Sequence, residues 1–231
     1  MKKPIRYIAF DADDTLWDCQ GHFERVMQEL YVLLEPWVDH HTAASELFAT
    51  ERKNMPLLGY GTKAFSLSML ETAMRVSHFE LSAKQLSWLQ DRCYSLLNLP
   101  ATPLPEVEET LQELHQRGWH MAVFTKGELL DQEHKLHRSG LGRFFEHLEI
   151  TSDKTEREFL NLCCQLDIAP QELLMVGNSL RSDVAPALAI GASAVHIPFH
   201  VTWELEHVEA FEHEHLTQIT HFSELIDVLE S

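Results

Sequence analysis

The feature that most constrains the fold is an alternation between helical periodicity and short apolar runs, which extends from residue 105 to residue 197. Helices are predicted over 105–117, 128–139, 153–166 and 180–190, and strands over 119–124, 147–150, 172–176 and 193–197. A further buried strand is predicted over 5–10. Repeated β-α units of this kind are typical of a parallel sheet that helices cover on both faces. The sequence therefore predicts the α/β class, with a doubly wound parallel sheet.

A long segment between the first and second predicted strands, from His22 to about Asn98, shows only helical periodicity. Its apolar residues form helical stripes over 22–34, 43–52, 65–76 and 83–97. We therefore predict a helical domain over residues 18–99, inserted into an α/β core made of residues 1–17 and 100–231.

The composition argues against several classes of partner. Asp and Glu total 36 against 18 Lys and Arg, which gives a formal net charge of −18 at pH 7. Such a field repels nucleic acids and anionic membrane surfaces. No apolar run approaches the ~18 residues that a membrane span needs, and the N-terminal apolar run is too short for a signal peptide. We therefore expect a cytoplasmic protein that binds neither nucleic acid nor membrane, whereas its oligomeric state is not readable from the sequence.

Three groups of polar side chains stand at the carboxyl ends of predicted strands: Asp11 with Asp13, Thr125, and Asn178 with Asp183. In an open parallel sheet, ligands bind beyond the carboxyl ends of the strands. Side chains at positions i and i+2 leave a strand in the same direction, so Asp11 and Asp13 are expected to face one site. The sequence therefore predicts a functional site around this carboxylate pair.

A site built from paired carboxylates needs a cation. Oxygen ligands without histidine or thiol suit Mg²⁺, which commonly binds through one or two carboxylates together with substrate phosphate oxygens. Asp183, at the start of a predicted helix, is expected to complete such a site. With the charge partly neutralised, Asp11 could attack phosphorus and form an aspartyl phosphate. Asp13 would protonate the leaving oxygen and later activate water.

Four short motifs resemble those of the haloacid dehalogenase superfamily. Asp11-Ala12-Asp13-Asp14-Thr15-Leu16 is similar to its first motif, and Phe124-Thr125 is similar to its second. Lys154 resembles the third-motif lysine, and the segment from Val176 to Asp183 resembles the acidic fourth motif. One such motif alone is a weak signal, but four in the family's order at predicted strand or helix junctions are a strong one. The resemblance implies a Rossmann-like core.

The resemblance also implies roles for the residues that carry it. Asp11 is implied to be nucleophile and metal ligand, and Asp13 to be the general acid and base that also offers the metal a backbone carbonyl. Asn178 and Asp183 are the further implied metal ligands. Asn178 stands where the family has an acid, and its amide oxygen can bind Mg²⁺ without contributing charge. Asp14 stands where the family usually has glycine, which alters the turn and adds a negative charge.

Other residues are expected to hold the phosphoryl group of the substrate. The resemblance implies that Thr125 and Lys154 do so, as hydroxyl donor and point charge, and Lys126 is expected to assist. A proline and two glycines predict a loop over 54–63, whose Lys63 is a candidate for contact with an anionic substrate. The helical insertion resembles the cap of small-molecule phosphatases. We therefore expect Mg²⁺-dependent hydrolysis of a small phosphorylated metabolite.

Five histidines lie between residues 196 and 215, and His213 is close to His215. Glutamates are interleaved with them. This pattern favours an acidic exposed segment over a metal site.

Three other functions remain open at this stage. A 2-haloacid dehalogenase uses the same aspartate on carbon without a metal, but its first motif lacks the second aspartate, so Asp13 argues against it. A phosphomutase shares the core and differs only in where the phosphoryl group goes. A binding protein that has lost catalysis is supported only by Asn178.

Overall fold

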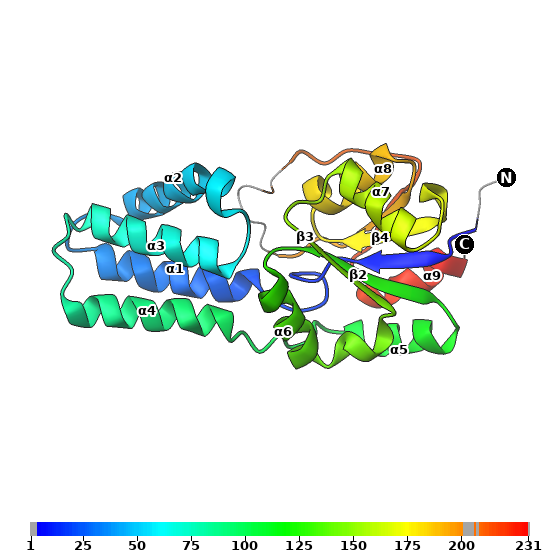
Figure 1. The fold of residues 1–231 in the computed structure, drawn as a ribbon, viewed down its shortest axis with the longest axis horizontal. Coiled ribbons are helices and arrows are strands. Elements are labelled where there is room, and N and C mark those ends of the chain that lie inside the picture. Colours follow the sequence, from blue (N-terminus) through cyan, green and yellow to red (C-terminus); the bar gives the residue numbers. More distant parts are fainter. Residues whose placement is uncertain (1–3, 201–205, 207, 231) are drawn as a thin grey trace. The chain divides into compact units, whose positions relative to one another are not determined.

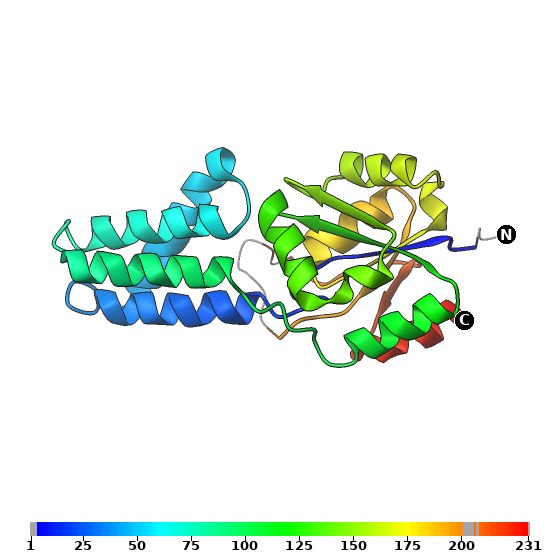
Figure 2. The same cartoon turned by 60° about the horizontal axis from the view of Figure 1, so that its bottom comes forward.

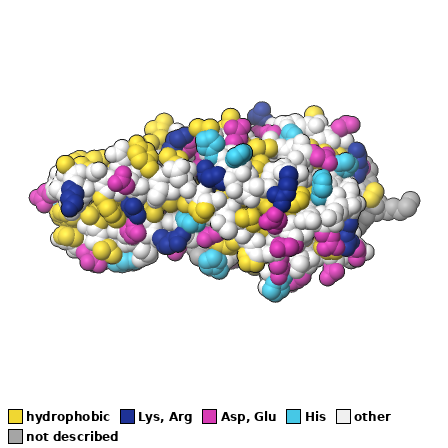
Figure 3. Space-filling model, turned by 90° about the horizontal axis from the view of Figure 1, so that it is seen from below, with side chains coloured by type: hydrophobic (Ala, Val, Ile, Leu, Met, Phe, Trp, Pro, Cys, Tyr) yellow, Lys and Arg dark blue, Asp and Glu magenta, His cyan; other side chains and the backbone are white. Residues whose placement is uncertain are grey.

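The computed structural model describes residues 4–200, 206 and 208–230. The chain forms two compact units, which we call the core unit (Met1–Gln20 with Ala101–Ser231) and the helical unit (Gly21–Pro100). Among the described helices, none is both long enough and apolar enough to cross a membrane. On the described face seen in Figure 3, lysine and arginine side chains are scattered among acidic ones rather than gathered into one basic surface.

The core unit is built on a parallel sheet, six-stranded in its described part, with the order β3-β2-β1-β4-β5-β6. All neighbouring strands pair in parallel. The strands are β1 (Tyr7–Phe10), β2 (His120–Lys126), β3 (His147–Thr151), β4 (Leu173–Gly177), β5 (Ser193–His196) and β6 (Leu216–Gln218). The prediction of an α/β fold with a parallel sheet is confirmed.

Helices cover both faces of this sheet (Figures 1 and 2). Alternate residues of β1 point to opposite faces, so Ile8 and Phe10 join one apolar cluster and Ala9 joins the other. The first cluster includes residues of α5 (Val107–Gln116), α6 (Leu129–Ser139) and α9 (Leu225–Glu230). The second includes residues of α7 (Glu156–Gln165) and α8 (Ala185–Ala189). The central strands β1, β2 and β4 are therefore buried on both sides, whereas the edge strands β3 and β6 are partly exposed.

The predicted helix over 180–190 is two elements. A short π-helical segment, Leu180–Val184, leads directly into α8. Its N-cap is Ser179, whose hydroxyl accepts a hydrogen bond from the backbone N–H of Ser182 at 3.0 Å. A π-helical turn is frequently found at functional sites.

The helical unit contains α1 (Gln20–Leu34) except its first residue, together with α2 (His40–Leu58), α3 (Thr62–Val76) and α4 (Ala83–Leu97). Its described residues form no strand. Side chains cap two of these helices. Asp39 accepts from the N–H of Thr42, and Ser82 forms a reciprocal capping box with Gln85. Buried leucines and a methionine form the interior, namely Leu30, Leu34, Leu47, Met69 and Leu89.

The predicted loop over 54–63 is wrong for most of its length. Helix α2 continues through Pro56 to Leu58, and only residues 59–61 connect it to α3. Proline near a helix end removes one hydrogen bond but keeps a helical φ, so it does not have to stop the helix. Gly59 ends it, with a φ of 69° that glycine adopts without steric cost.

The interpretation of residues 196–215 as an exposed acidic segment is confirmed for residues 208–214, which are exposed, but it is wrong for His196. His196 is buried at the end of β5, and Leu216–Gln218 adds a sixth strand at the sheet edge directly after this segment. A three-residue edge strand has too little periodicity to be recognised from sequence. His207 and residues 201–205 lie outside the described residues, and His213 and His215 make no metal cluster within the described part.

Candidate active site

The sheet register brings the predicted site residues to one edge of the core unit. Strand β1 lies between β2 and β4, and Phe10 pairs with Val123 on one side and Val176 on the other. Asp11 follows Phe10 directly, and its backbone N–H donates to the carbonyl of Val176 at 2.9 Å. Thr125 and Asn178 each come two residues after the partners of Phe10. They therefore flank Asp11 at the carboxyl ends of the three central strands.

Lys154 joins two of the carboxylates. Its Nζ donates to Asp11 Oδ1 at 2.5 Å and to Asp183 Oδ1 at 2.6 Å. All three side chains are almost fully buried. Lys154 comes from the connection between β3 and α7, so the cluster joins segments that are far apart in sequence. One ammonium thus holds the predicted nucleophile and the fourth-motif aspartate together.

The charges of this cluster are unbalanced, because two buried carboxylates face one lysine. Burial first, and the nearby charge of Asp183 second, raise the pKa of Asp11 to about 7, although Lys154 acts in the opposite direction. The two carboxylates raise the pKa of Lys154 in spite of the opposing effect of burial. A second cation would relieve the excess negative charge and favour the ionised, nucleophilic form of Asp11.

Thr15 links Asp11 to Asn178. Its hydroxyl lies 3.2 Å from Asp11 Oδ2 and 3.1 Å from Asn178 Oδ1, and it accepts a hydrogen bond from the Asn178 N–H at 3.1 Å. The sequence pattern assigned no role to Thr15. Its place in the first motif was the available signal, and its tertiary contact with Asn178 supplies the reason for a hydroxyl there.

Asp183 is held in place by the backbone as well as by Lys154. The N–H of Ser179 donates to Asp183 Oδ2 at 2.9 Å. Gly177 makes room for this arrangement, since a Cβ at that position would lie 2.3 Å from Asp183 Oδ2 and 2.4 Å from Asp183 Cγ. The glycine at the end of β4 is therefore required for space.

Gly177→Ala is expected to displace the Asp183 carboxylate from Lys154 and from the Ser179 N–H. We expect a loss of about 1–3 kcal/mol in the free energy of unfolding, as for overpacking elsewhere, and a reduction in kcat of at least about tenfold. Urea unfolding and phosphate-release assays measure the two effects. Gly142→Ala is the control, because its Cβ would lie 3.7 Å from the nearest side-chain atom, an ordinary contact. Equal behaviour of the two variants would contradict the prediction.

The Asp13 carboxylate lies in a separate network. Trp17 Nε1 donates to its Oδ1 at 2.7 Å, Gln132 Nε2 donates to its Oδ2 at 2.8 Å, and Lys135 Nζ lies 2.9 Å from Oδ2. Burial alone would raise the pKa of Asp13, but the charge of Lys135 and these hydrogen bonds outweigh burial and lower it. Asp13 is therefore ionised in this structure. The contacts of Gln132 and Lys135 with Asp13 were not predicted from the sequence. The only hint was that the two residues lie three positions apart, on one face of the helix after the second motif.

The backbone conformation at position 14 is one that glycine prefers, in agreement with the glycine that the resemblance implies there. The φ of Asp14 is 63°, in the left-handed region that glycine prefers and that Asp and Asn tolerate. Its Oδ1 accepts hydrogen bonds from the N–H groups of Cys19 and Gln20, both at 2.8 Å. Asp14 thus caps the chain where α1 begins. Burial, and to a smaller extent the negative charge of Asp13, raise the pKa of Asp14 to about 7 against these hydrogen bonds.

Asp14→Asn is expected to make the protein more stable at alkaline pH. The pKa of Asp14 is about 7 in the folded protein, against an ordinary 3.8. The stability that the Asp14 contacts provide is therefore fully present below pH 3.8, and it is lost as the pH rises through about 7. Asparagine keeps the acceptor oxygen and tolerates the backbone, but it does not ionise. The variant should gain about 1–2 kcal/mol over the parent at about pH 8, and less at about pH 5.

Urea titrations of both proteins without added metal measure this difference. Asp39→Asn is a control, because Asp39 also caps a helix but has a lowered pKa, owing first to its hydrogen bonds with Thr42. A constant difference between Asp14→Asn and the parent across the pH range would contradict the assignment.

Lys126 and Thr125 end β2. Thr125 is buried, with 2 % of its surface exposed. The ammonium of Lys126 donates to Ser182 Oγ at 2.7 Å and pairs with the carboxylate of Glu206. Lys63 lies in the first turn of α3 in the helical unit. The contact of Lys63 with substrate stays a prediction. The contact of Glu206 with Lys126 was not predicted from the sequence.

The donor chemistry fits a magnesium ion. Asp11 Oδ2 and Asn178 Oδ1 both converge on the Thr15 hydroxyl, and Asp183 joins them through Lys154, so the available donors are all oxygens. Among the described residues, no three His, Cys, Asp or Glu side chains are grouped to hold a metal. Asn178 is an amide and is not one of these ligand types, and the Asp13 carboxylate contacts Lys135 at 2.9 Å. The expected ligand roles of the Asn178 amide oxygen and the Asp13 backbone carbonyl stay predictions.

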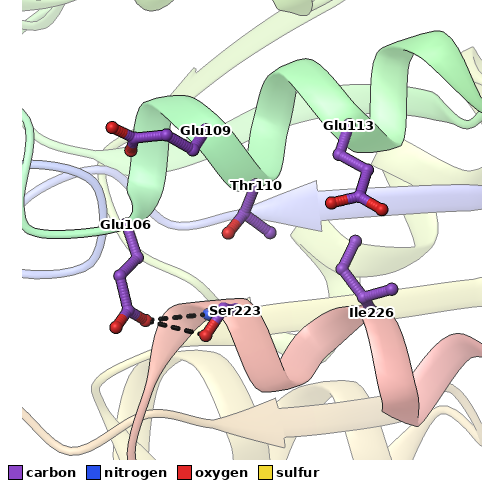
Figure 4. Close-up of a pocket in the computed structure, with 6 residues that line it drawn as sticks. All are labelled: Glu106, Glu109, Thr110, Glu113, Ser223 and Ile226. Atoms are coloured by element: carbon purple, nitrogen blue, oxygen red, sulfur yellow. Dashed lines mark hydrogen bonds between the residues drawn. The ribbon is translucent and has the colours of Figure 1, made fainter.

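A groove elsewhere in the core unit is a poor candidate for binding an anionic substrate (Figure 4). It lies between α5 and the C-terminal helices, and its lining residues are Glu106, Glu109, Thr110, Glu113, Ser223 and Ile226. Glu106 accepts hydrogen bonds from Ser223 within it. The three glutamates would repel an anionic substrate, so the strand-end cluster remains the candidate active site.

The core unit thus has a parallel sheet with a buried cluster of Asp11, Lys154 and Asp183 at the carboxyl ends of its strands. The family model of haloacid dehalogenase-like hydrolases matches residues 5–191. The chain is therefore a member of the haloacid dehalogenase-like hydrolase family.

Individual relatives and a solved structure resemble most or nearly all of the chain. The glyceraldehyde 3-phosphate phosphatase of Pyrococcus furiosus is 27 % identical over 98 % of this chain and 93 % of its own length. The N-acylneuraminate-9-phosphatase of Rattus norvegicus is 25 % identical over 82 % of this chain and 81 % of its own. The crystal structure of a haloacid dehalogenase-like family hydrolase from Xanthomonas campestris superposes with a TM-score of 0.86 and 27 % identity, over 97 % of this chain and 91 % of that one.

Proposed function

We propose that this protein hydrolyses a small phosphomonoester in a Mg²⁺-dependent reaction, through a phosphoryl intermediate on Asp11. The observation that carries the proposal is the buried Asp11 carboxylate, paired with Lys154 at 2.5 Å, with a second aspartate two residues further along the chain. The two curated relatives described above are named as phosphatases of small phosphorylated metabolites. The chain is accordingly a phosphoric monoester hydrolase, whereas the metal and the intermediate are part of our proposal.

In the first step, the ionised Asp11 carboxylate attacks phosphorus and the bond to the ester oxygen breaks. Lys154 and Thr125 stabilise the charge on the transferring phosphoryl oxygens. In the second step, water attacks the same phosphorus, releases phosphate and regenerates the Asp11 carboxylate. Magnesium, held by Asp11, Asp183, Asn178 and the backbone carbonyl of Asp13, would supply charge neutralisation.

Asp13 is the group that transfers protons. In its ionised form, which Lys135 stabilises, it is ready to accept a proton from the attacking water in the second step. Protonation of the leaving oxygen in the first step requires Asp13 to carry a proton. The negative charge of a bound phosphoryl group would raise the pKa of Asp13. We infer that substrate binding thereby favours protonated Asp13, which is held less strongly by Lys135.

Asp13 also favours phosphatase over dehalogenase chemistry. Displacement of a halide needs no proton donor for the leaving group, whereas departure of an alkoxide does. Structures of 2-haloacid dehalogenases share the fold with this chain at 17–20 % identity, which supports the fold alone. Phosphomutase activity would use the same Asp11 and would be seen as phosphoryl transfer between two positions of a sugar.

The test is phosphate release from a panel of phosphorylated metabolites, beginning with glyceraldehyde 3-phosphate, with added Mg²⁺ or with a chelator. We expect turnover that depends on the metal. The same samples are checked for chloride release from 2-chloropropionate and for isomerised sugar phosphates. Chloride release without phosphate release would identify a dehalogenase, and the absence of any turnover together with no calorimetric Mg²⁺ binding would identify a binding protein.

A further inference from the structure

Four side chains of the core unit form a closed polar network next to the proposed phosphoryl site. Glu206 Oε2 accepts hydrogen bonds from Ser179 Oγ and Ser182 Oγ, both at 2.6 Å. Its other oxygen pairs with Lys126, whose ammonium also donates to Ser182 Oγ at 2.7 Å. Three donors thus converge on one carboxylate. Ammonium and hydroxyl donors in this arrangement are what an anionic ligand would need.

The sheet order places this network across the end of β1. Lys126 and Ser179 each lie three residues beyond the partners of Phe10, on the strands to either side of β1. Two strands that flank a third are about 10 Å apart. The 2.7 Å contact between Lys126 Nζ and Ser182 Oγ therefore joins segments that follow the strands on the two sides of β1. The network is joined to the Asp11 cluster through the Ser179 N–H, which binds Asp183.

The Glu206 carboxylate is well protected from solvent. The side chains of Lys126 and Glu206 are 16 % and 10 % exposed, and Ser179 and Ser182 are buried. Burial would raise the pKa of Glu206, but Lys126 and the two serines outweigh burial and hold it below its usual value. Glu206 is therefore an ionised carboxylate in a site with the chemistry of an anion receptor.

We propose that Lys126, Ser179 and Ser182 form a second anion-binding subsite beside the phosphoryl site, and that Glu206 fills it. The enzyme consequently prefers phosphomonoesters without a further anionic group close to the phosphate. A substrate carboxylate at this position meets a like charge, or must displace Glu206 from its three donors. The inference rests on the proposed phosphatase function and adds the charge class of the substrate to it.

The experiment uses two substrates that differ in one group. Glyceraldehyde 3-phosphate and 3-phosphoglycerate have the same carbon chain, with an aldehyde in the first and a carboxylate in the second. The quantity compared is the ratio of kcat/KM for 3-phosphoglycerate to kcat/KM for glyceraldehyde 3-phosphate. The parent enzyme should favour glyceraldehyde 3-phosphate by at least about tenfold, and Glu206→Gln should raise the ratio by about tenfold or more. Glu206→Ala should change it in the same direction.

Two further variants test whether the cation of the subsite sets this ratio. Lys126→Gln combined with Glu206→Gln removes that cation, so the gain on 3-phosphoglycerate should disappear. Glu214→Gln removes one charge from an 82 % exposed side chain in the same acidic segment, and it should leave the ratio unchanged. Thermal unfolding shows which variants are folded.

Parent enzyme that hydrolyses neither substrate nor any other phosphoester would contradict the proposed function itself. Parent enzyme that hydrolyses both substrates equally well would overturn the inference alone. The inference would also be overturned if folded Glu206 variants changed kcat/KM for both substrates by the same factor. Glu206 would then have a structural role and no effect on substrate preference.

Discussion

Asp11→Asn is expected to reduce phosphate release by at least about ten-thousandfold in kcat, because removal of a nucleophile removes the only covalent route. The amide that replaces the carboxylate cannot attack phosphorus. The fold should survive, since Asp11 is a buried carboxylate with a raised pKa and an uncharged side chain costs less to bury there. Lys154 keeps Asp183 as its partner at 2.6 Å. Loss of activity without loss of stability is thus the expected pattern.

The measurement combines steady-state kinetics with mass spectrometry of enzyme quenched in acid during turnover. The parent should show a phosphoryl adduct on the peptide that contains Asp11, and the variant should show none. Asp18→Asn is a control from the same segment, with the same chemical change outside the cluster. Comparable turnover of Asp11→Asn and the parent would rule out the nucleophile assignment, and an adduct on another residue would relocate it.

Lys154→Met is expected to have the largest effect on stability. The side chain of Lys154 is 1 % exposed and lies between two carboxylates that are 11 % and 1 % exposed. Removing one partner of a buried ion pair leaves uncompensated charge, which costs about 3–5 kcal/mol. In a protein of this size that corresponds to a melting temperature lower by about 6–20 °C. Activity should also be lost, because the variant lacks the charge that we propose stabilises the phosphoryl group.

Differential scanning calorimetry in the presence of a chelator tests this prediction without compensation by a metal ion. Lys53→Met is the control, since the ion pair of Lys53 with Glu71 is 69 % and 37 % exposed and should contribute less than about 1 kcal/mol. Adding Asp183→Asn to Lys154→Met should recover part of the lost stability by removing one unpaired carboxylate. Failure of that recovery would show that packing rather than charge is the cause of the loss in Lys154→Met.

Local sequence patterns predicted the elements of this protein well. Short apolar runs and the 3.6-residue pattern predicted the strands and helices of the core unit up to residue 197, since each depends on neighbours a few residues away. The C-terminal helix α9 was not predicted. Errors arose where local signals are weak or ambiguous. Pro56 was predicted to lie in a loop but lies within α2, and the three-residue strand β6 is too short for a pattern.

For the site too, the sequence predicted some features, and others came only from the tertiary structure. Asp11, Thr125 and Asn178 were expected together because each follows a strand of one parallel sheet, and the register places them side by side. The structure also brings Lys154 and Asp183 to Asp11. The roles of these residues in catalysis and in metal binding are what the experiments above examine.

The class of fold, and the presence of Asp11 and Asp13 at the end of the first strand, could be read from the sequence alone. What each carboxylate contacts could not, because those contacts exist only in the tertiary structure. Asp11 meets Lys154 from 143 residues away, Asp13 meets Lys135 from 122 residues away, and Lys126 meets Glu206 from 80 residues away. Periodicity records which face of an element is buried, but contacts at such separations depend on strand order and on helix packing. The charge environment of the site therefore appears only when the sheet is assembled.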